Sequence, residues 1–192
     1  AERFDAALYF PGEAHMDAMA ALNALLVAVR GFGVDVQLGV PYAKGDEDIL
    51  IDCRGMAARN DIADLRGVRG ERIIVRAKDV TLQRPVRLLH PRQPIYVVPQ
   101  GDGRFVIGAT VIEREDAGAV TVRSALELLG SAFALDPGFA EAEIIDMGAG
   151  VRPAFADNTP RILIEGGGKI VRVNGMYRHG FLLAPVMAEA VA

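Results

Sequence analysis

Between Arg72 and Ile107 the sequence contains four short runs rich in β-branched and aliphatic residues, separated by segments that contain proline, glycine or charged residues. The runs are Arg72–Ala77, Val86–Leu89, Ile95–Val98 and Arg104–Ile107. Runs of this length and composition are typical of β-strands. The loop from Pro99 to Gly103 has glycines that tolerate positive φ, so it predicts a hairpin between the last two runs. A β-sheet is therefore expected in the middle of the chain.

The sequence before this β-rich part has mixed helical and strand character. Asp17 is suited to cap a helix that ends at Gly31 or Gly33 and that packs one apolar side on a core. The helical spacing is kept by Leu22, Leu25, Leu26 and Val29. Strands are expected at 34–38 and 49–53, and the second is an apolar run typical of a strand covered on both faces.

The sequence after the β-rich part continues this mixture. A second helix is predicted from Thr121 or Ser124 to Leu135, because Ser124 and Glu127 have the spacing of a capping box and Asp-Pro-Gly follows. A further strand at 143–147 leads into a glycine-rich stretch. A helix followed by a parallel-type strand favours α/β architecture, so the expected fold class is mixed α/β, or α+β.

Composition excludes several classes of protein. With 51% hydrophobic and 24% charged residues, the 192-residue chain is expected to fold, as one domain or one domain plus part of another. A net charge of -4 gives no basic face for nucleic acid. The longest apolar stretch, 22–29, is too short for a membrane span, and no signal peptide is recognisable. Cys53, the single cysteine, is interpreted as a small buried hydrophobe in a cytoplasmic protein.

The segment from Gly175 to Pro185 has the outline of an anion or cofactor site. It follows a strand-like stretch, 169–174, and opens a terminal apolar helix. Backbone amides at a helix start, freed of side-chain bulk by Gly175 and Gly180, suit an electron-rich ligand, and Arg178 adds positive charge.

Arg152 and Tyr96 are candidates for binding a carboxylate. Arg152 stands between Gly150 and Pro153 at the expected exit of a strand, where a stiff backbone would hold its guanidinium for a fork to a carboxylate. Spacing alone favours a structural ion pair instead. Tyr96 lies in an aliphatic strand and taken alone is more typical of a core residue, although a buried hydroxyl needs a partner that a ligand carboxylate would supply.

Other chemistries have little support. His15, His90 and His179 are far apart and have no carboxylate or cysteine at ligand spacing, so a metal site is not expected. No Gly-x-Ser-x-Gly elbow is present. The glycines at 148–150 and 166–168 complete no nucleotide motif, and a tight hairpin explains the triple glycine better than phosphate binding.

Several motifs occur in the order seen in the D-amino-acid oxidase family of flavoenzymes, which the chain resembles. They are residues 95–99, 103–110, 150–153, 157–160 and 174–185, with 52–55 and 67–71 also fitting. Within that family the chain most resembles the glycine oxidases of thiamine biosynthesis. The resemblance implies a β-rich substrate domain at 71–150, the C-terminal part of an FAD-binding domain at 151–192, and a part linking the two at 1–70.

The resemblance also implies a function and a site. The expected reaction is FAD-dependent oxidation of a small amino acid, with hydride transfer from the α-carbon to flavin N5, reoxidation by O2 to H2O2 and no obligatory catalytic base. Arg152 and Tyr96 would bind the substrate carboxylate, and Arg178 would assist. The flavin ring would contact Met176, Tyr177, Arg178, His179, Gly180, Phe181 and Leu182. Met176 and His179 depart from the family pattern, which leaves the choice of substrate open.

The G-x-G-x-x-G fingerprint with which the family begins is absent from this sequence. The chain is therefore expected to be a C-terminal portion without the N-terminal Rossmann segment, inactive alone and weak in binding FAD. A sarcosine or D-amino-acid oxidase is one alternative. Another is a non-catalytic domain that binds a small carboxylate or a partner protein. Whether the protein forms a homo-oligomer is left open.

Overall fold

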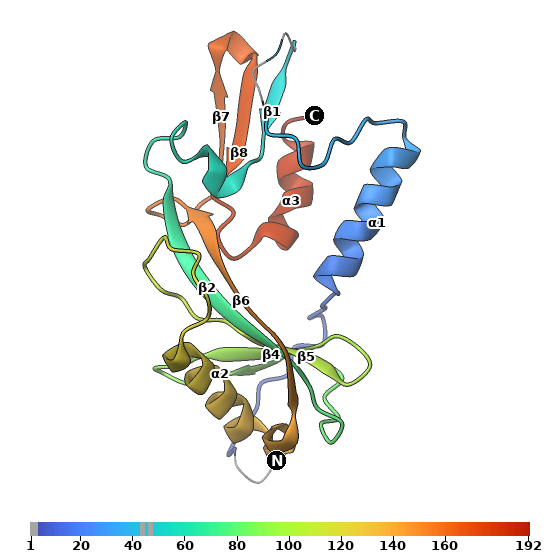
Figure 1. Cartoon of the computed structure of the whole chain (residues 1–192), viewed down its shortest axis with the longest axis vertical. Coiled ribbons are helices and arrows are strands. Elements are labelled where there is room, and N and C mark those ends of the chain that lie inside the picture. Colours follow the sequence, from blue (N-terminus) through green and yellow to red (C-terminus); the bar gives the residue numbers. More distant parts are fainter. Residues whose placement is uncertain (1–3, 43–44, 46–47) are drawn as a thin grey trace. The chain divides into compact units, whose positions relative to one another are not determined.

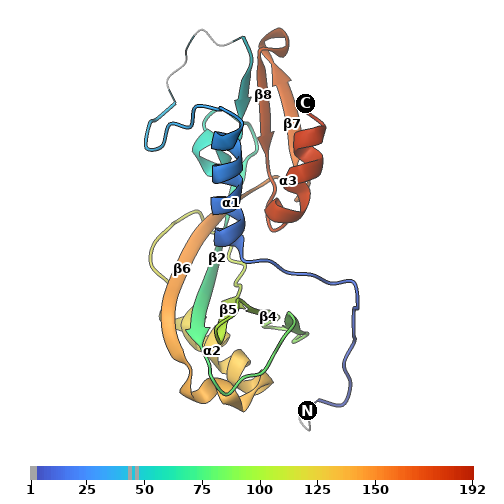
Figure 2. The ribbon, with the colours of Figure 1, turned by 90° about the vertical axis from the view of Figure 1, so that its right-hand side faces the viewer.

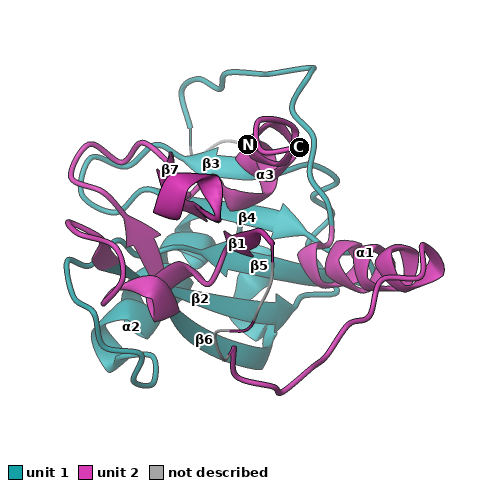
Figure 3. Ribbon diagram, turned by 90° about the horizontal axis from the view of Figure 1, so that it is seen from above, with its two compact units in different colours: residues 1–16, 68–151 teal, residues 17–67, 152–192 magenta. Residues whose placement is uncertain are grey.

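The computed structural model describes residues 4–42, 45 and 48–192. Residues 1–3, 43–44 and 46–47 belong to the expected linking part and lie outside the described residues. The fold is mixed α/β, as predicted, with helices and two sheets (Figure 1). The chain divides into two compact units, each built from two separate stretches (Figure 3). Unit 1 comprises residues 1–16 and 68–151, and unit 2 comprises residues 17–67 and 152–192.

The sheet of unit 1 has the strand order β3-β4-β5-β2-β6. Its strands are β2 (Arg66–Arg76), β3 (Val86–Leu88), β4 (Ile95–Pro99), β5 (Arg104–Gly108) and β6 (Glu143–Ala154). The predicted hairpin is confirmed, because β4 and β5 pair antiparallel and the glycines at 101 and 103 have φ of 78° and 66°. Tyr96 and Arg72 are both partners of Gly108, each on a different side of β5.

One face of this sheet carries the core of unit 1. Helix α2 (Val122–Leu135) packs there and brings Leu128 and Ala132 against the buried side chains of the strands. The strand residues in this cluster are Ile73, Val75, Ile95, Val97, Phe105 and Ile107. The helix begins after Thr121, one of the two predicted starts, whose hydroxyl accepts the N–H of Ser124, so the predicted capping box of Ser124 and Glu127 does not begin the helix. The short helix η2 (Pro137–Glu141) follows it.

A buried ion pair ties the segment before α2 to strand β2. Arg69 and Glu71 are 2% and 0% exposed, and the guanidinium Nε donates to the Glu71 carboxylate over 2.8 Å. The guanidinium also donates to the backbone oxygens of Asp116, Gly118 and Ala119. These bonds to backbone oxygens hold residues 116–119 on the sheet.

We expect Glu71→Ala to lower the free energy of unfolding by about 3 kcal/mol, because the buried Arg69 guanidinium loses its buried carboxylate partner and keeps only the half-exposed carboxylate of Asp116, at 2.9 Å. Urea denaturation would measure the loss. Asp146→Ala, which removes an exposed partner of Arg72, is the matched control and should change stability by less than about 1 kcal/mol. Equal losses in the two variants would contradict this account of the buried pair.

The sheet of unit 2 has the order β1-β8-β7, where β1 (Leu50–Asp52) and β8 (Ile170–Asn174) are parallel. Strand β7 (Arg161–Glu165) pairs antiparallel with β8 through the turn η3 (Gly166–Gly168), so the triple glycine forms the predicted hairpin (Figure 2). Helix α3 (Gly180–Glu189) closes the chain, and η1 (Gly55–Ala58) follows β1. A small core unites Ala58, Ile62, Leu65 and Phe155.

Four expectations about unit 2 are wrong. Helix α1 (Ala18–Gly31) has the predicted Asp17 cap, but none of its residues is buried, since no element of the described chain covers its apolar side. No strand forms at 34–38. Strand β1 is not covered on both faces, because Ile51 is 52% exposed, and Cys53 after it is exposed and not a core residue. Among the described helices, none is long and apolar enough to cross a membrane.

A second charge network joins the two parallel strands of unit 2. The Asp52 carboxylate accepts two bonds from the Arg54 guanidinium, at 2.9 and 2.8 Å, and a third from Arg172, its partner in register on β8. The bonds from Arg54 lower the pKa of Asp52 from 3.8 to about 2, against the opposing effect of burial. Because the pKa in the folded state is depressed, this carboxylate stabilises the fold above pH 4, and the contribution is lost as pH falls from 4 toward 2.

At pH 7 we expect Asp52→Asn to cost about 2 kcal/mol of unfolding free energy, which is the shift in pKa converted to energy. The difference from the unsubstituted chain should shrink as pH falls from 4 to 2. Urea titrations at several pH values would measure it, with Asp35→Asn on the exposed surface as the control. A difference that stays constant with pH would show that the carboxylate charge is not the cause.

Candidate flavin and substrate site

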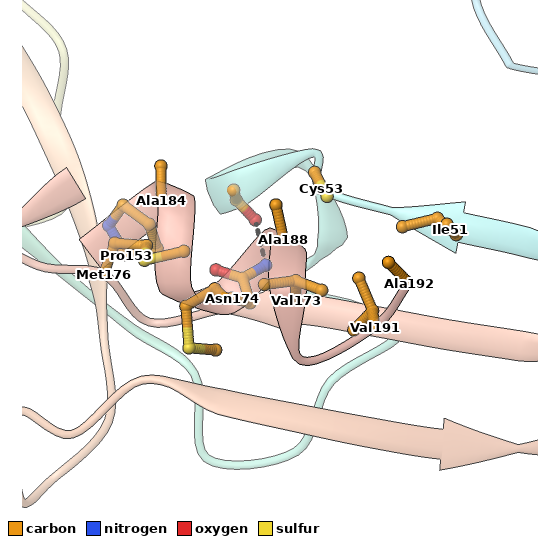
Figure 4. Close-up of a pocket in the computed structure, with 12 residues that line it drawn as sticks. Ile51, Cys53, Pro153, Val173, Asn174, Met176, Ala184, Ala188, Val191 and Ala192 are labelled. Atoms are coloured by element: carbon orange, nitrogen blue, oxygen red, sulfur yellow. Dashed lines mark hydrogen bonds between the residues drawn. The ribbon is translucent and has the colours of Figure 1, made fainter. Parts of the chain in front are cut away.

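The carboxyl ends of the parallel strands β1 and β8 meet at one edge of the sheet in unit 2. This edge is the usual place for a ligand in an open α/β sheet. A cavity of about 620 Å³ lies there and is mostly apolar (Figure 4). Its walls come from the strand ends, from Pro153 of β6 and from α3, which supplies Ala184, Met187 and Ala188. Asn174 and Met176, at the exit of β8, also line it.

The backbone at the exit of β8 is closely fitted to its surroundings. Asn174 is buried, and its side-chain NH2 donates to the Gly55 carbonyl over 3.0 Å while its side-chain oxygen accepts the Gly175 N–H over 2.8 Å. Gly175 has φ of 80°, and a Cβ at this position would lie 2.4 Å from a ring carbon of Phe155. Only glycine satisfies both the conformation and the space.

Arg152 lies within strand β6 and not at its exit, because the strand extends to Ala154. The predicted strand end at 147 is wrong because pairing continues through the glycines at 148 and 150. The carbonyl of the next residue, Pro153, accepts the N–H of Tyr177 over 3.0 Å. The structure thus brings the strand that carries Arg152 together with the predicted flavin segment.

The remaining residues of that segment form a turn and the start of α3. Met176 lines the cavity, and Tyr177, with φ of 49°, is half-buried. Arg178, His179, Phe181 and Leu182 are exposed, and Gly180 is the first residue of the helix. No side chain caps α3 at His179, so the partial positive charge of the helix start is open to an acceptor.

Tyr96 lies in unit 1, whereas Arg152 and residues 176–182 lie in unit 2. It is half-buried on the sheet face opposite the core, as its alternation with Ile95 and Val97 predicts. Its hydroxyl rests over Gly108, where a Cβ would come within 2.6 Å of the phenol oxygen. The aromatic ring therefore depends on a glycine in the neighbouring strand.

Sequence reasoning missed the contributions of Cys53, Asn174 and Met187 to the cavity. The signal for Cys53 was its place directly after an apolar strand, where side chains of an α/β sheet meet ligands. Partial burial and the neighbouring Asp52 raise the pKa of the Cys53 thiol, so it lines the cavity as a neutral group. Across the ranges described, no three His, Cys, Asp or Glu side chains gather as a metal would require.

Comparison with known proteins identifies the family of the chain. The whole chain, residues 1–192, matches the family model DAO, described as FAD dependent oxidoreductase. A putative thiamine biosynthesis oxidoreductase ThiO from Rhizobium etli is 50% identical over 193 residues, which cover 100% of this chain and 58% of that protein. A glycine oxidase from Geobacillus kaustophilus is 33% identical over 127 residues, covering 65% of this chain and 33% of that protein.

Solved structures show the same likeness. The crystal structure of glycine oxidase from Bacillus cereus superposes with a TM-score of 0.63 at 26% identity, over 74% of this chain and 41% of that enzyme. The chain thus spans less than two thirds of the length of these relatives. The resemblance seen in the sequence motifs is confirmed, and FAD is the cofactor of the family. The chain belongs to the D-amino-acid oxidase (DAO) family of FAD-dependent oxidoreductases.

Proposed function

We propose that this chain forms the substrate-binding part and the last section of the flavin-binding part of an oxidase for glycine or another small amino acid. Its product would serve thiamine thiazole synthesis. The similarity to a putative thiamine biosynthesis oxidoreductase and to glycine oxidases supports this. The observation that carries it is the hydrogen bond from Tyr177 to Pro153, which holds the strand of Arg152 against the flavin segment beside the apolar cavity.

The residues around the cavity fit an isoalloxazine ring. The walls are apolar, Met176 offers an adaptable thioether, and the uncapped start of α3 offers backbone N–H groups to an electron-rich edge. The ring would be held by residues 176–182. When bound, FAD supplies a hydride acceptor for the substrate α-carbon and is reoxidised by O2 with release of H2O2.

The substrate would be held by its carboxylate. The guanidinium of Arg152 would fork onto the two carboxylate oxygens and the Tyr96 hydroxyl would donate to one of them, while Arg178 adds positive charge. Holding the α-carbon in line for transfer contributes several powers of ten in rate without any protein base. The substrate amine must be neutral for this step. Because no protein base takes part, the residues of the site serve to orient the substrate and to exclude water.

The relatives are longer than this chain, and we propose that the complete protein has a further segment that binds the ADP half of FAD. The 192 residues alone would then lack the contacts to diphosphate and adenosine. Two charge-assisted hydrogen bonds to phosphate are worth about 3 kcal/mol or more, which is about 100-fold in Kd.

FAD titration should therefore separate the short and the extended protein. We expect the 192-residue chain to bind FAD at least about 100-fold more weakly than the chain extended by a preceding segment like that of its relatives. Flavin fluorescence and isothermal calorimetry would measure both constants. A short chain that binds FAD as tightly as the extended one would contradict the proposed division. An extended chain that binds no flavin and stays colourless would favour the alternative of a non-catalytic domain that binds a small carboxylate or a partner protein.

Arg152→Met in the extended, flavin-containing protein should lower kcat/KM for glycine by about 100-fold or more, since a buried charge pair with the carboxylate is lost. Peroxide release from glycine, sarcosine and D-alanine would be followed, and the preferred substrate identified from the ratios. Arg123→Met, on the exposed side of α2, is the control for the loss of a positive charge. Normal kinetics in Arg152→Met would remove Arg152 from the site.

A further inference from the structure

The face of the unit 1 sheet opposite the core carries a row of aligned residues from neighbouring strands. Arg87 of β3 pairs with Tyr96 of β4, Tyr96 with Gly108 of β5, and Gly108 with Arg72 of β2. Residues paired in this way point to the same side of a sheet. The row thus reads guanidinium, phenol, glycine, guanidinium.

The phenol of Tyr96 leans toward the Arg72 end of this row. A Cβ on Gly108 would lie 2.6 Å from its hydroxyl oxygen, so the hydroxyl rests above β5 and away from Arg87. Strands β4 and β2 are two strand spacings apart, about 10 Å. With its hydroxyl above the strand between them, Tyr96 covers about half of that separation, and Arg72 starts on the far side of Gly108.

The guanidinium of Arg72 lies close to the backbone of β6, at a second glycine. A Cβ on Gly148 of β6 would lie 3.1 Å from the central carbon of its guanidinium. The guanidinium donates to Asp146 over 2.6 Å, and the two side chains are 41% and 48% exposed. An ion pair this exposed contributes little to stability, so a ligand carboxylate can replace Asp146 at small cost.

Glycine inside a strand weakens the sheet, and it often marks a place where a ligand comes close to the backbone. Gly108 and Gly148 lie on the two strands that flank Arg72, so the Tyr96 hydroxyl lies over β5 and the Arg72 guanidinium over β6, on the same face of the sheet. This arrangement suits a small anion lying flat on the sheet, because a guanidinium fork matches a carboxylate.

We propose that Arg72 is a specificity-determining residue that favours substrates with a second carboxylate. The proposal rests on the proposed function, in which Tyr96 holds one end of an amino-acid substrate. A second carboxylate on that substrate would displace Asp146 and pair with Arg72. Neutral substrates of the same size would gain nothing from Arg72.

The first test compares charged and neutral substrates of matched size in the flavin-containing protein. The ratio of kcat/KM for aspartate to that for asparagine, and for N-(carboxymethyl)glycine to that for N-(carbamoylmethyl)glycine, is measured before and after Arg72→Met. We expect the larger ratio to fall by about tenfold or more, while kcat/KM for glycine changes less than about twofold. Equal losses for charged and neutral substrates, or no loss, would overturn the proposal.

Arg76→Met is the matched control. Arg76 lies on the same strand and face, pairs with the exposed Glu143 over 3.2 Å and is 45% exposed, but its partner on β5 is Arg104 and not Gly108. Its substitution should leave the ratios unchanged. A fall as large as that in Arg72→Met would show a general effect of surface charge and would sink the idea.

The second test does not depend on turnover. Malonate and acetate are titrated into the 192-residue chain at constant ionic strength, and the NMR signals of the arginine Nε–H groups and of the tyrosine rings are followed. Malonate should shift the Arg72 and Tyr96 signals more than acetate does, and Arg72→Met should abolish the difference. If the protein oxidises no amino acid, the proposed function fails on its own while this titration still decides the anion site. Equal shifts by both anions would refute it.

Discussion

The contact between Phe155 and Gly175 is the constraint on which the candidate flavin site depends. Phe155 is 1% exposed and belongs to the small core of unit 2, so its ring cannot move aside. The ring occupies the space that any side chain at 175 would need. The chain leaving β8 is therefore fixed in position. From that point it reaches the carbonyl of Pro153 through Tyr177 and then starts α3, which forms one wall of the cavity.

The same device recurs where Tyr96 and Arg72 lie on glycines of the neighbouring strands. In each case a bulky side chain gains its position from the absence of a side chain on the neighbouring strand. Each unit also contains a buried ion pair that fixes its strands. Arg69 pairs with Glu71 in unit 1, and Asp52 pairs with Arg172 in unit 2. Buried pairs of this kind fix one arrangement because each partner is costly to leave alone.

Local sequence pattern predicted those parts whose cause is local. The β4–β5 hairpin, the cap of α1 and the start of α3 follow from glycine, Asp17 and apolar spacing within a few residues. Burial could not be predicted in this way. Apolar spacing identifies the apolar side of α1, but it does not show which element, if any, packs against that side. Cys53 was misplaced for that reason. Arg152 and Tyr96 received a predicted role only through the family motifs, because spacing alone favoured an ion pair for Arg152 and a core position for Tyr96.

The apolar surface of unit 2 bears on the proposal that the complete protein has a further segment. On α1, Leu25 and Leu22 are 59% and 49% exposed, and β1 stands at an edge of its sheet with Ile51 half exposed. Proteins usually shield an edge strand and cover a large apolar stripe, because both invite association. The cavity beside β1 is apolar as well. A segment that adds a strand at this edge would bury apolar surface and bring further backbone to the carboxyl ends of the strands. One interaction would then support folding and cofactor binding together.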